Sequence, residues 1–302
     1  MPTNTSSQSD FEVVSLKRNI KSPRTLFGLF MSGVAGLFTL LAVIPLFIIL
    51  TYLLTKGISS LSLAVFTELP PPPLVDGGGF GNAIIGTVIM VGIGALISVP
   101  IGVMAAIYLS EFNEGKAAEW IRFATNVLSG VPSIIVGVFA YSAIVLTNFI
   151  IPKGYSAWAG GFALSILMLP IIVRTTDESL KLVPQEVRQA SIGIGANQYQ
   201  TVLQVVLPAA LPAIITGVTL SVARAAGETA PLLFTALFTQ YWPDWGNGLN
   251  EPTASLAVLV YNFAIVPFKN QQDLAWGAAF ILVLLVLLTS IISRLATAKR
   301  TY

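Results

Sequence analysis

The chain has no cysteine, no histidine and few charges, since only 10% of its 302 residues are Asp, Glu, Lys or Arg. The first two absences exclude thiol nucleophiles, disulfide bonds, Ser-His-Asp triads and the usual ligand sets of zinc and haem. The sequence also contains no G-x-x-x-x-G-K-[ST] loop, with which many ATPases bind their nucleotide. We therefore expect a chain that is not an enzyme, holds no metal or cofactor, and depends on another subunit for any energy from ATP.

Apolar residues make up 55% of the chain, and they form runs long enough to cross a membrane. Soluble domains carry about 25% charged residues, whereas a membrane-spanning helix needs about 20 apolar residues. Because no alternating pattern of short strands is present, helices are the structure that can satisfy the backbone in lipid. The sequence predicts an all-α polytopic membrane protein with six transmembrane helices, at residues 25–55, 82–110, 123–152, 154–173, 207–238 and 274–293.

Basic residues are distributed unevenly between the two sides of this arrangement. Twelve of the sixteen Lys and Arg residues fall in the N-terminal tail, the second and fourth loops and the C-terminal end, whereas three fall in the other loops and Arg224 lies in the fifth segment. Cytoplasmic loops carry the excess of Lys and Arg. Residues 1–24 and 299–302 are therefore predicted to be cytoplasmic, and residues 25–298 to form one six-span domain. The first apolar run exceeds a signal-peptide core, so we expect it to remain as a span.

Three further polar stretches are interpreted as surface features. The net charge of +2 does not indicate nucleic-acid binding, and the basic residues 17–24 are expected to lie against anionic membrane lipid. Glu111, Glu114 and Glu119 are expected to form a solvated face of a short cytoplasmic loop. The stretch VDGGGFGNAIIGT (75–87) resembles a phosphate-binding loop that enters a helix. Because it lacks a lysine and follows TELPPPPL instead of a strand, we favour a turn-rich outer loop.

The fourth loop, residues 174–208, has the pattern of two short helices outside the membrane. Pro184 suits the first turn of a helix, and Gly195 permits a turn that a side chain would resist. A second short helix is predicted at residues 198–206, leading into the fifth span at Pro208. The alternative is an ordinary amphipathic surface element.

The fifth segment carries Arg224 and Glu228 within an apolar run. An unpaired charge at the centre of a membrane helix costs at least about 2.5 kcal/mol, and such residues usually face a bundle interior or a water-filled path. Four residues apart on one predicted helix face, the two side chains can form an ion pair. Arginine keeps its charge and can donate two parallel hydrogen bonds to an oxyanion. We therefore predict an anion pathway here; the alternative is that the pair locks the span against a neighbouring helix.

The fourth loop resembles the cytoplasmic signature of ABC-importer permeases, which is E-A-A, three residues, Gly, nine residues, Ile, one residue, Leu-Pro. The full spacing is present, with Gln, Ser and Val in place of Glu, the second Ala and Ile. In that family the signature forms the coupling helix that docks into the ATPase, so the resemblance implies an ATPase-coupling role for residues 174–207. The matching residues are Gln189, Ala190, Ser191, Gly195, Val205, Leu207 and Pro208.

The stretch RAAGETAPLLFTA (224–236) resembles the PstA-type membrane subunits of phosphate importers. Similarity extends through GNAIIGT (81–87), PIIVRTTDESLKLVP (170–184) and PTASLAVLVYNFA (252–264), and so covers nearly the whole chain after the tail. The resemblance implies a type I ABC importer permease fold that moves phosphate into the cell by alternating access. It also implies a substrate pathway at Arg224, Glu228 and Thr229.

The same resemblance implies the partners and the location. These are a PstC-like permease subunit in a heterodimer, two PstB-like ATPase subunits that bind ATP and Mg²⁺, and a PstS-like extracytoplasmic phosphate-binding protein. The chain would be a multi-pass protein of the bacterial plasma (inner) membrane. Trp242, Trp245 and Tyr261, in the predicted outer loop 238–273, are expected to form an interfacial belt or part of the dock for the binding protein.

Three alternatives remain open from the sequence. A permease for sulfate, molybdate or phosphonate would keep the coupling loop and change the pathway residues. A secondary transporter would use Glu228 as a proton carrier and would leave the coupling spacing unexplained. A nontransporting sensor or scaffold would tolerate the loss of Arg224.

Overall fold

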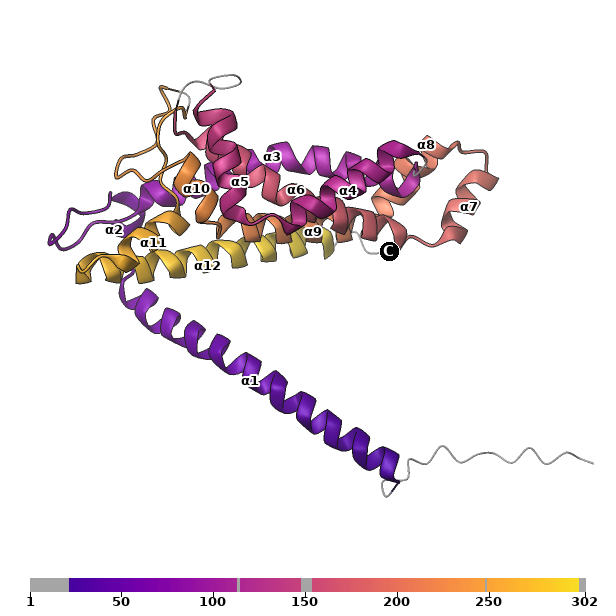
Figure 1. Cartoon of the computed structure of the whole chain (residues 1–302), viewed down its shortest axis with the longest axis horizontal. Helices are drawn as coiled ribbons and strands as arrows, with labels where there is room; N and C mark the ends of the chain where they lie inside the picture. Colours follow the sequence, from indigo (N-terminus) through magenta and orange to yellow (C-terminus); the bar gives the residue numbers. More distant parts are fainter. Residues whose placement is uncertain (1–21, 113–114, 148–153, 248, 299–302) are drawn as a thin grey trace, which may run out of the picture. The chain divides into compact units, whose positions relative to one another are not determined.

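Every regular element in the described part of the chain is a helix, and no strand occurs there (Figure 1). The computed structural model describes residues 22–112, 115–147, 154–247 and 249–298. The predicted ends of the chain, apart from residues 22–24, lie outside these ranges. The elements are α1 (Pro23–Ser59), α2 (Ala64–Thr67), α3 (Gly81–Glu111), α4 (Lys116–Gly130), α5 (Ser133–Ala140), the π-helix η1 (Tyr141–Val145), α6 (Ala157–Lys181), α7 (Gln185–Gly193), α8 (Gln198–Thr201), the π-helix η2 (Val202–Val206), α9 (Leu207–Ala226), α10 (Ala230–Thr235), α11 (Leu256–Ile265) and α12 (Lys269–Ala298).

The chain divides into a part that ends at Tyr52 and a larger part that begins at Leu53. In the first part, α1 is a continuous helix whose side chains up to Tyr52 are almost all exposed. Two of its hydroxyl groups, those of Thr39 and Thr51, donate to the carbonyls of Ala35 and Phe47 one turn earlier. An apolar helix with its polar groups bonded internally is what a lipid environment requires, and the first predicted span is confirmed as a helix.

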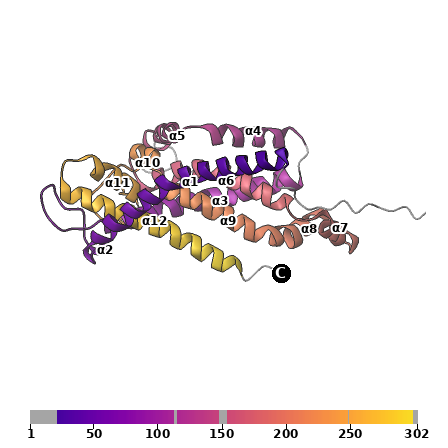
Figure 2. The ribbon, with the colours of Figure 1, turned by 90° about the horizontal axis from the view of Figure 1, so that it is seen from below.

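The larger part is built around α3, α6 and α9. α3 and α6 run parallel, since Gly94 lies against Gly161 and Leu164, and Gly102 lies further along against Ile172. A Cβ atom on Gly102 would come within 2.8 Å of the Ile172 side chain, so the glycine permits this close approach. Small residues at helix contacts are typical of membrane proteins, where close packing replaces the hydrophobic driving force. Seen from below, α4 and α5 lie on one side of α3, α6 and α9, and α12 lies on the other (Figure 2).

The contact between α6 and α9 depends on Gly217. A Cβ atom at this position would come within 2.2 Å of Thr175 Oγ1 and 2.6 Å of Thr175 Cβ, and rotation of the threonine cannot move the second atom away. We expect Gly217→Val to destabilise the protein by roughly 1–3 kcal/mol, because overpacking must separate the two helices. Thermal unfolding in detergent measures the effect. The matched control is Gly92→Val on α3, where no atom lies within 4 Å of the added Cβ, and equal midpoints for the two variants would contradict the prediction.

Two predicted spans differ from straight helices. The third is a pair, α4 and α5–η1, bent by 108° at a break after Gly130. Pro132 directly precedes α5 and leaves Val131 extended, because proline disfavours the helical conformation in the residue before it. Among the described residues, five helices are long and apolar enough to cross a membrane, and counting the bent pair as one span gives six candidate spans.

The fifth predicted span, 207–238, was wrong at its end. α9 stops at Ala226, and α10 begins at Ala230 with Pro231 in its first turn. In a continuous helix the proline ring would clash with the carbonyl four residues earlier and would supply no N–H. The predicted outer loop 238–273 also contains a helix, α11, which packs against α12.

Candidate functional site

Arg224 and Glu228 form an ion pair at the break in the fifth span. Arg224 lies in the last turn of α9, and its Nε is 3.6 Å from Glu228 Oε1. Glu228 follows the helix end, where the N–H of Gly227 still donates to the Arg224 carbonyl. The expected pair is therefore present, but the expectation of a single helix face was wrong because Glu228 lies in the connection. Thr229 is next to the pair and is the N-cap residue of α10.

The two charged side chains differ in exposure. The Arg224 side chain is 63% exposed, whereas that of Glu228 is 16% exposed. Ala225 and Ala226, which separate them, are buried in the core cluster that includes Met90 and Leu232. The carboxylate is thus held close to the packed core while the guanidinium reaches out from it, with its planar fork accessible.

The fourth loop folds as a helix, a turn and a second helix, as predicted. Gly195 adopts a φ of +96°, which side-chain-bearing residues rarely adopt, so it makes the turn between α7 and α8. Asn197 then starts α8 with a capping box that it shares with Gln200. Two boundaries differ from the prediction: α6 continues through residue 181, so the loop begins after 174, and Pro184 is the N-cap of α7 instead of its first residue.

The signature residues of this loop differ in exposure. Gln189 and Ala190 are exposed on α7, as are the neighbouring apolar side chains of Ile192 (57%) and Ile194 (88%). Ser191 is buried, and its hydroxyl is 3.0 Å from that of Thr201 on α8. The exposed residues present a surface to the outside, whereas the buried Ser191 fastens α7 to α8. The remaining signature residues, Val205, Leu207 and Pro208, join η2 to the start of α9.

Sequence reasoning missed an ion pair that holds this loop. Arg188 on α7 binds Glu111 at the end of α3 through Nη1 and Oε2, and the side chains are 14% and 7% exposed. The prediction that Glu111 is solvated was therefore wrong; Glu119 is exposed as expected, and Glu114 lies outside the described residues. The pair joins residues 77 apart in the chain, so no local pattern could have indicated it.

A second charged group ties α4 to the same end of the bundle. Arg122 on α4 lies 3.7 Å from Asp177 on α6, and its Nη2 donates to the Leu109 carbonyl of α3 at 3.1 Å. Asp177 also accepts a hydrogen bond from Lys181 at 2.6 Å. The ends of α3, α4 and α6 are thus cross-linked beside the α7–α8 loop.

Residues 75–80 of the glycine-rich stretch form a packed turn that leads into α3 at Gly81, which agrees with the turn favoured from the sequence. The N–H groups of Gly79, Phe80 and Gly81 donate to the carbonyls of Leu69, Val65 and Glu68, so they are not directed at an anion. A Cβ atom on Gly79 would come within 2.1 Å of the Ala64 carbonyl oxygen. A pocket of about 420 Å³ next to this turn is lined by two lysines, Lys56 and Lys269, but also by Asp76 and Asp273. The balanced charge does not favour an anion.

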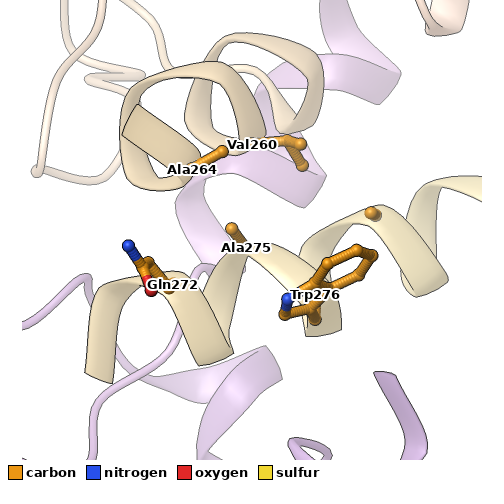
Figure 3. Close-up of a pocket in the computed structure, with 6 residues that line it drawn as sticks. Val260, Ala264, Gln272, Ala275 and Trp276 are labelled. Carbon is orange, nitrogen blue, oxygen red and sulfur yellow. The ribbon is translucent and has the colours of Figure 1, made fainter. Parts of the chain in front are cut away.

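A second pocket, of about 290 Å³, lies between α11 and α12 (Figure 3). Val260 and Ala264 of α11 face Gln272, Ala275 and Trp276 of α12. The Gln272 amide donates to the Val266 carbonyl at 2.8 Å. No cationic side chain lines this pocket, so Arg224 remains the better candidate for contact with an anion.

Comparisons with known proteins agree with this architecture. Residues 98–300 match the family described as binding-protein-dependent transport system inner membrane component. The chain is 41% identical over 249 residues to the phosphate transport system permease protein PstA of Yersinia pestis, covering 82% of each chain. It is 43% identical over 266 residues to the protein of the same name from Haemophilus influenzae, covering 88% of this chain and 92% of the other. Its identity to PstA 1 of Mycobacterium tuberculosis is 32% over 302 residues.

Two solved transporters share the fold. The inward-facing MetNI methionine ABC transporter matches with a TM-score of 0.56 and 20% identity, over 73% of this chain and 94% of the other. A bacterial alginate ABC transporter in complex with an alginate pentasaccharide-bound periplasmic protein matches with a TM-score of 0.57 and 14% identity, over 91% and 94%. The expected type I ABC importer permease fold and the multi-pass membrane character are thereby confirmed. This chain belongs to the family of binding-protein-dependent transport system inner membrane components, within its group of PstA permease proteins.

Proposed function

We propose that this chain is the permease subunit of an ATP-driven ABC importer that moves inorganic phosphate into the cell by alternating access. The observation that carries the proposal is the exposed Arg224, paired with the more buried Glu228 at the break between α9 and α10. It occurs in a chain that is 43% identical to a phosphate transport system permease protein. Substrate contact is assigned to Arg224, Glu228 and Thr229.

The chemistry of the pair suits transit of an oxyanion. The guanidinium of Arg224 is permanently charged and can donate two parallel hydrogen bonds to phosphate oxygens. A transit site must also release its ion, so binding has to be favourable but weak. Glu228 lowers the local positive charge, and this partial neutralisation favours release of phosphate. The Thr229 hydroxyl adds a neutral hydrogen-bonding group beside the pair.

The exposure of Arg224 supports a second permease subunit. A charge that faced lipid at mid-membrane would cost at least about 2.5 kcal/mol. The exposed guanidinium therefore calls for protein or water on its outer side. We assign this place to a PstC-like companion, so that the pathway runs between two homologous subunits.

The coupling loop supports an ATPase partner. Its exposed residues Gln189, Ala190 and Ile192 form a surface on which an ATPase subunit can dock. We assign this place to a PstB-like subunit, which would itself bind ATP and Mg²⁺. A second such subunit would serve the companion permease.

The assignment places the α7–α8 end of the bundle in the cytoplasm, where the excess of Lys and Arg belongs. Both termini then lie in the cytoplasm, and a PstS-like phosphate-binding protein docks on the other face of the plasma (inner) membrane.

Labelled orthophosphate uptake tests the proposal. Vesicles would contain this chain with its companion, the ATPase and the binding protein, and uptake would be measured with ATP, without ATP, and with a hundredfold excess of unlabelled sulfate or molybdate. We expect ATP-dependent uptake that neither competitor reduces. Competition by sulfate or molybdate would indicate that the permease accepts that oxyanion, and uptake driven by an ion gradient without ATP would indicate a secondary transporter.

A further inference from the structure

The coupling loop has a side-chain attachment to the membrane helices, in addition to its chain connections to α6 and α9. On one side, α8 runs through η2 directly into α9. On the other side, the Arg188 guanidinium of α7 binds Glu111 at the end of α3 and donates through Nη2 to the Leu180 carbonyl in the last turn of α6, at 2.8 Å. One side chain thus connects α7 with two further helices.

The geometry of this attachment is fixed by burial and by hydrogen bonds to both oxygens of the Glu111 carboxylate. Glu111 Oε2 accepts from Arg188, and Oε1 accepts from the Ser110 hydroxyl at 3.0 Å. The Leu180 carbonyl, in the last turn of α6, also accepts from the Val183 N–H at 3.2 Å, and basic side chains commonly bond carbonyls at this end of a helix. Removing either partner of a buried ion pair leaves the other charge buried and unpaired, which is strongly destabilising. Arg188 and Glu111 therefore hold each other in place.

α8 is attached to the same point of α3. The Gln198 side chain donates to the Glu111 backbone carbonyl at 2.8 Å, and the rings of Tyr199 and Phe112 lie 5.1 Å apart. The hydrogen bond between Ser191 and Thr201 joins α7 to α8. The loop and the end of α3 therefore share contacts from both short helices.

We propose that Arg188 and Glu111 form a clamp, a pair of positioning residues that makes α3 and α6 move with the coupling loop when the ATPase subunits close. Without the clamp, α7 would still dock to the ATPase, but α3 would be held to the loop only by the contacts of Gln198 and Tyr199, and α6 only by the chain connection 182–184, so less of the displacement would reach them. α3 and α6 pack against each other, so the core of the bundle follows the loop most closely when the clamp is intact. The inference rests on the proposed ATP-driven function.

The first arm of the test measures phosphate transported per ATP hydrolysed in vesicles that contain the full complex. Glu111→Gln and Arg188→Met are expected to lower this ratio by between about 5-fold and 150-fold, the usual range of coupling between sites. ATPase co-purification should be unchanged, because the exposed residues of α7 are intact. Glu119→Gln is the matched control, since it removes an exposed carboxylate of the neighbouring helix α4 and should leave the ratio unchanged.

The double variant, Glu111→Gln with Arg188→Met, guards against misfolding. It leaves no unpaired buried charge, so it should assemble even where a single variant does not, and it should still be uncoupled. A double variant with the wild-type ratio would overturn the clamp.

The second arm measures movement directly. Because the chain has no cysteine, Met104→Cys on α3 and Gly193→Cys on α7 can carry a pair of spin labels. In the otherwise unchanged complex, the distance between the labels should be the same in the nucleotide-free and the ATP-trapped states. With Glu111→Gln it should change or broaden on trapping; identical distances in both proteins and both states would refute the proposal. If the unmodified complex takes up no phosphate, the proposed function fails, whereas the clamp is still decided by the label distances.

Discussion

Replacing Arg224 by glutamine should lower ATP-driven phosphate uptake by roughly 10-fold to 100-fold while leaving assembly of the complex intact. A hydrogen bond to a charged group contributes about 1.5–3 kcal/mol, and each 1.4 kcal/mol corresponds to about tenfold in affinity or rate. Glutamine keeps much of the length of the side chain but has neither the charge nor the fork. Because the Arg224 side chain is largely exposed in this chain, its loss should disturb the fold little. Initial rates of labelled orthophosphate uptake measure the effect.

Three companion variants give this result its meaning. Arg224→Lys keeps the charge but not the fork, so uptake should fall to an intermediate level. Glu228→Gln should bind phosphate more tightly and release it more slowly, because the partial neutralisation is gone. Arg174→Gln, the same change at another exposed arginine of the bundle, should retain uptake within about twofold of wild type. Full uptake in Arg224→Gln would move the charged pair from substrate handling to locking of the fifth span, the alternative left open by the sequence.

Gly195→Val should abolish or strongly weaken ATPase binding. At the observed φ of +96°, a residue in a sparsely populated backbone region costs about 1–3 kcal/mol, and a β-branched side chain adds to that strain. No atom lies within 4 Å of an added Cβ atom, so the effect would come from the backbone alone. Relaxing the turn would rotate α7 relative to α8 and misplace the exposed residues Gln189 and Ala190. Co-purification of the ATPase with the tagged permease measures docking.

The matched control lies two residues earlier. Gly193 also has open space around a Cβ atom but lies within α7 and lacks the positive φ. Gly193→Val should therefore retain the ATPase nearly as well as wild type. Equal retention by the two valine variants would show that the turn at Gly195 does not determine docking.

The docking variant and the clamp variants separate two steps of coupling. Gly195→Val acts on attachment of the ATPase, whereas Glu111→Gln acts after attachment, on movement of α3 and α6. A complex with normal ATPase content and a low ratio of transport to hydrolysis would indicate the second step. Loss of the ATPase would indicate the first.

Several features of the fold and the site could be predicted because they depend on local sequence. The long apolar runs predict helices that cross lipid, since the backbone has to be satisfied within each segment. The turn at Gly195 depends on the conformational freedom of one residue. Arg224 and Glu228 stand out because charges are costly in an apolar run. Their spacing of four positions keeps the side chains within reach even though the helix ends at Ala226.

The tertiary structure decided which residues far apart in the chain meet. Glu111 looks like an ordinary loop carboxylate in the sequence, yet α3 ends where α7 passes, so it is buried against Arg188. The approach of α6 to α9 at Gly217 depends in the same way on how two helices cross. Composition and spacing indicated a helical membrane protein with a helix-turn-helix in its fourth loop and a charged fifth span. The connection between loop and bundle was decided by the relative placement and register of the helices, because contacts across 77 residues leave no trace in local periodicity.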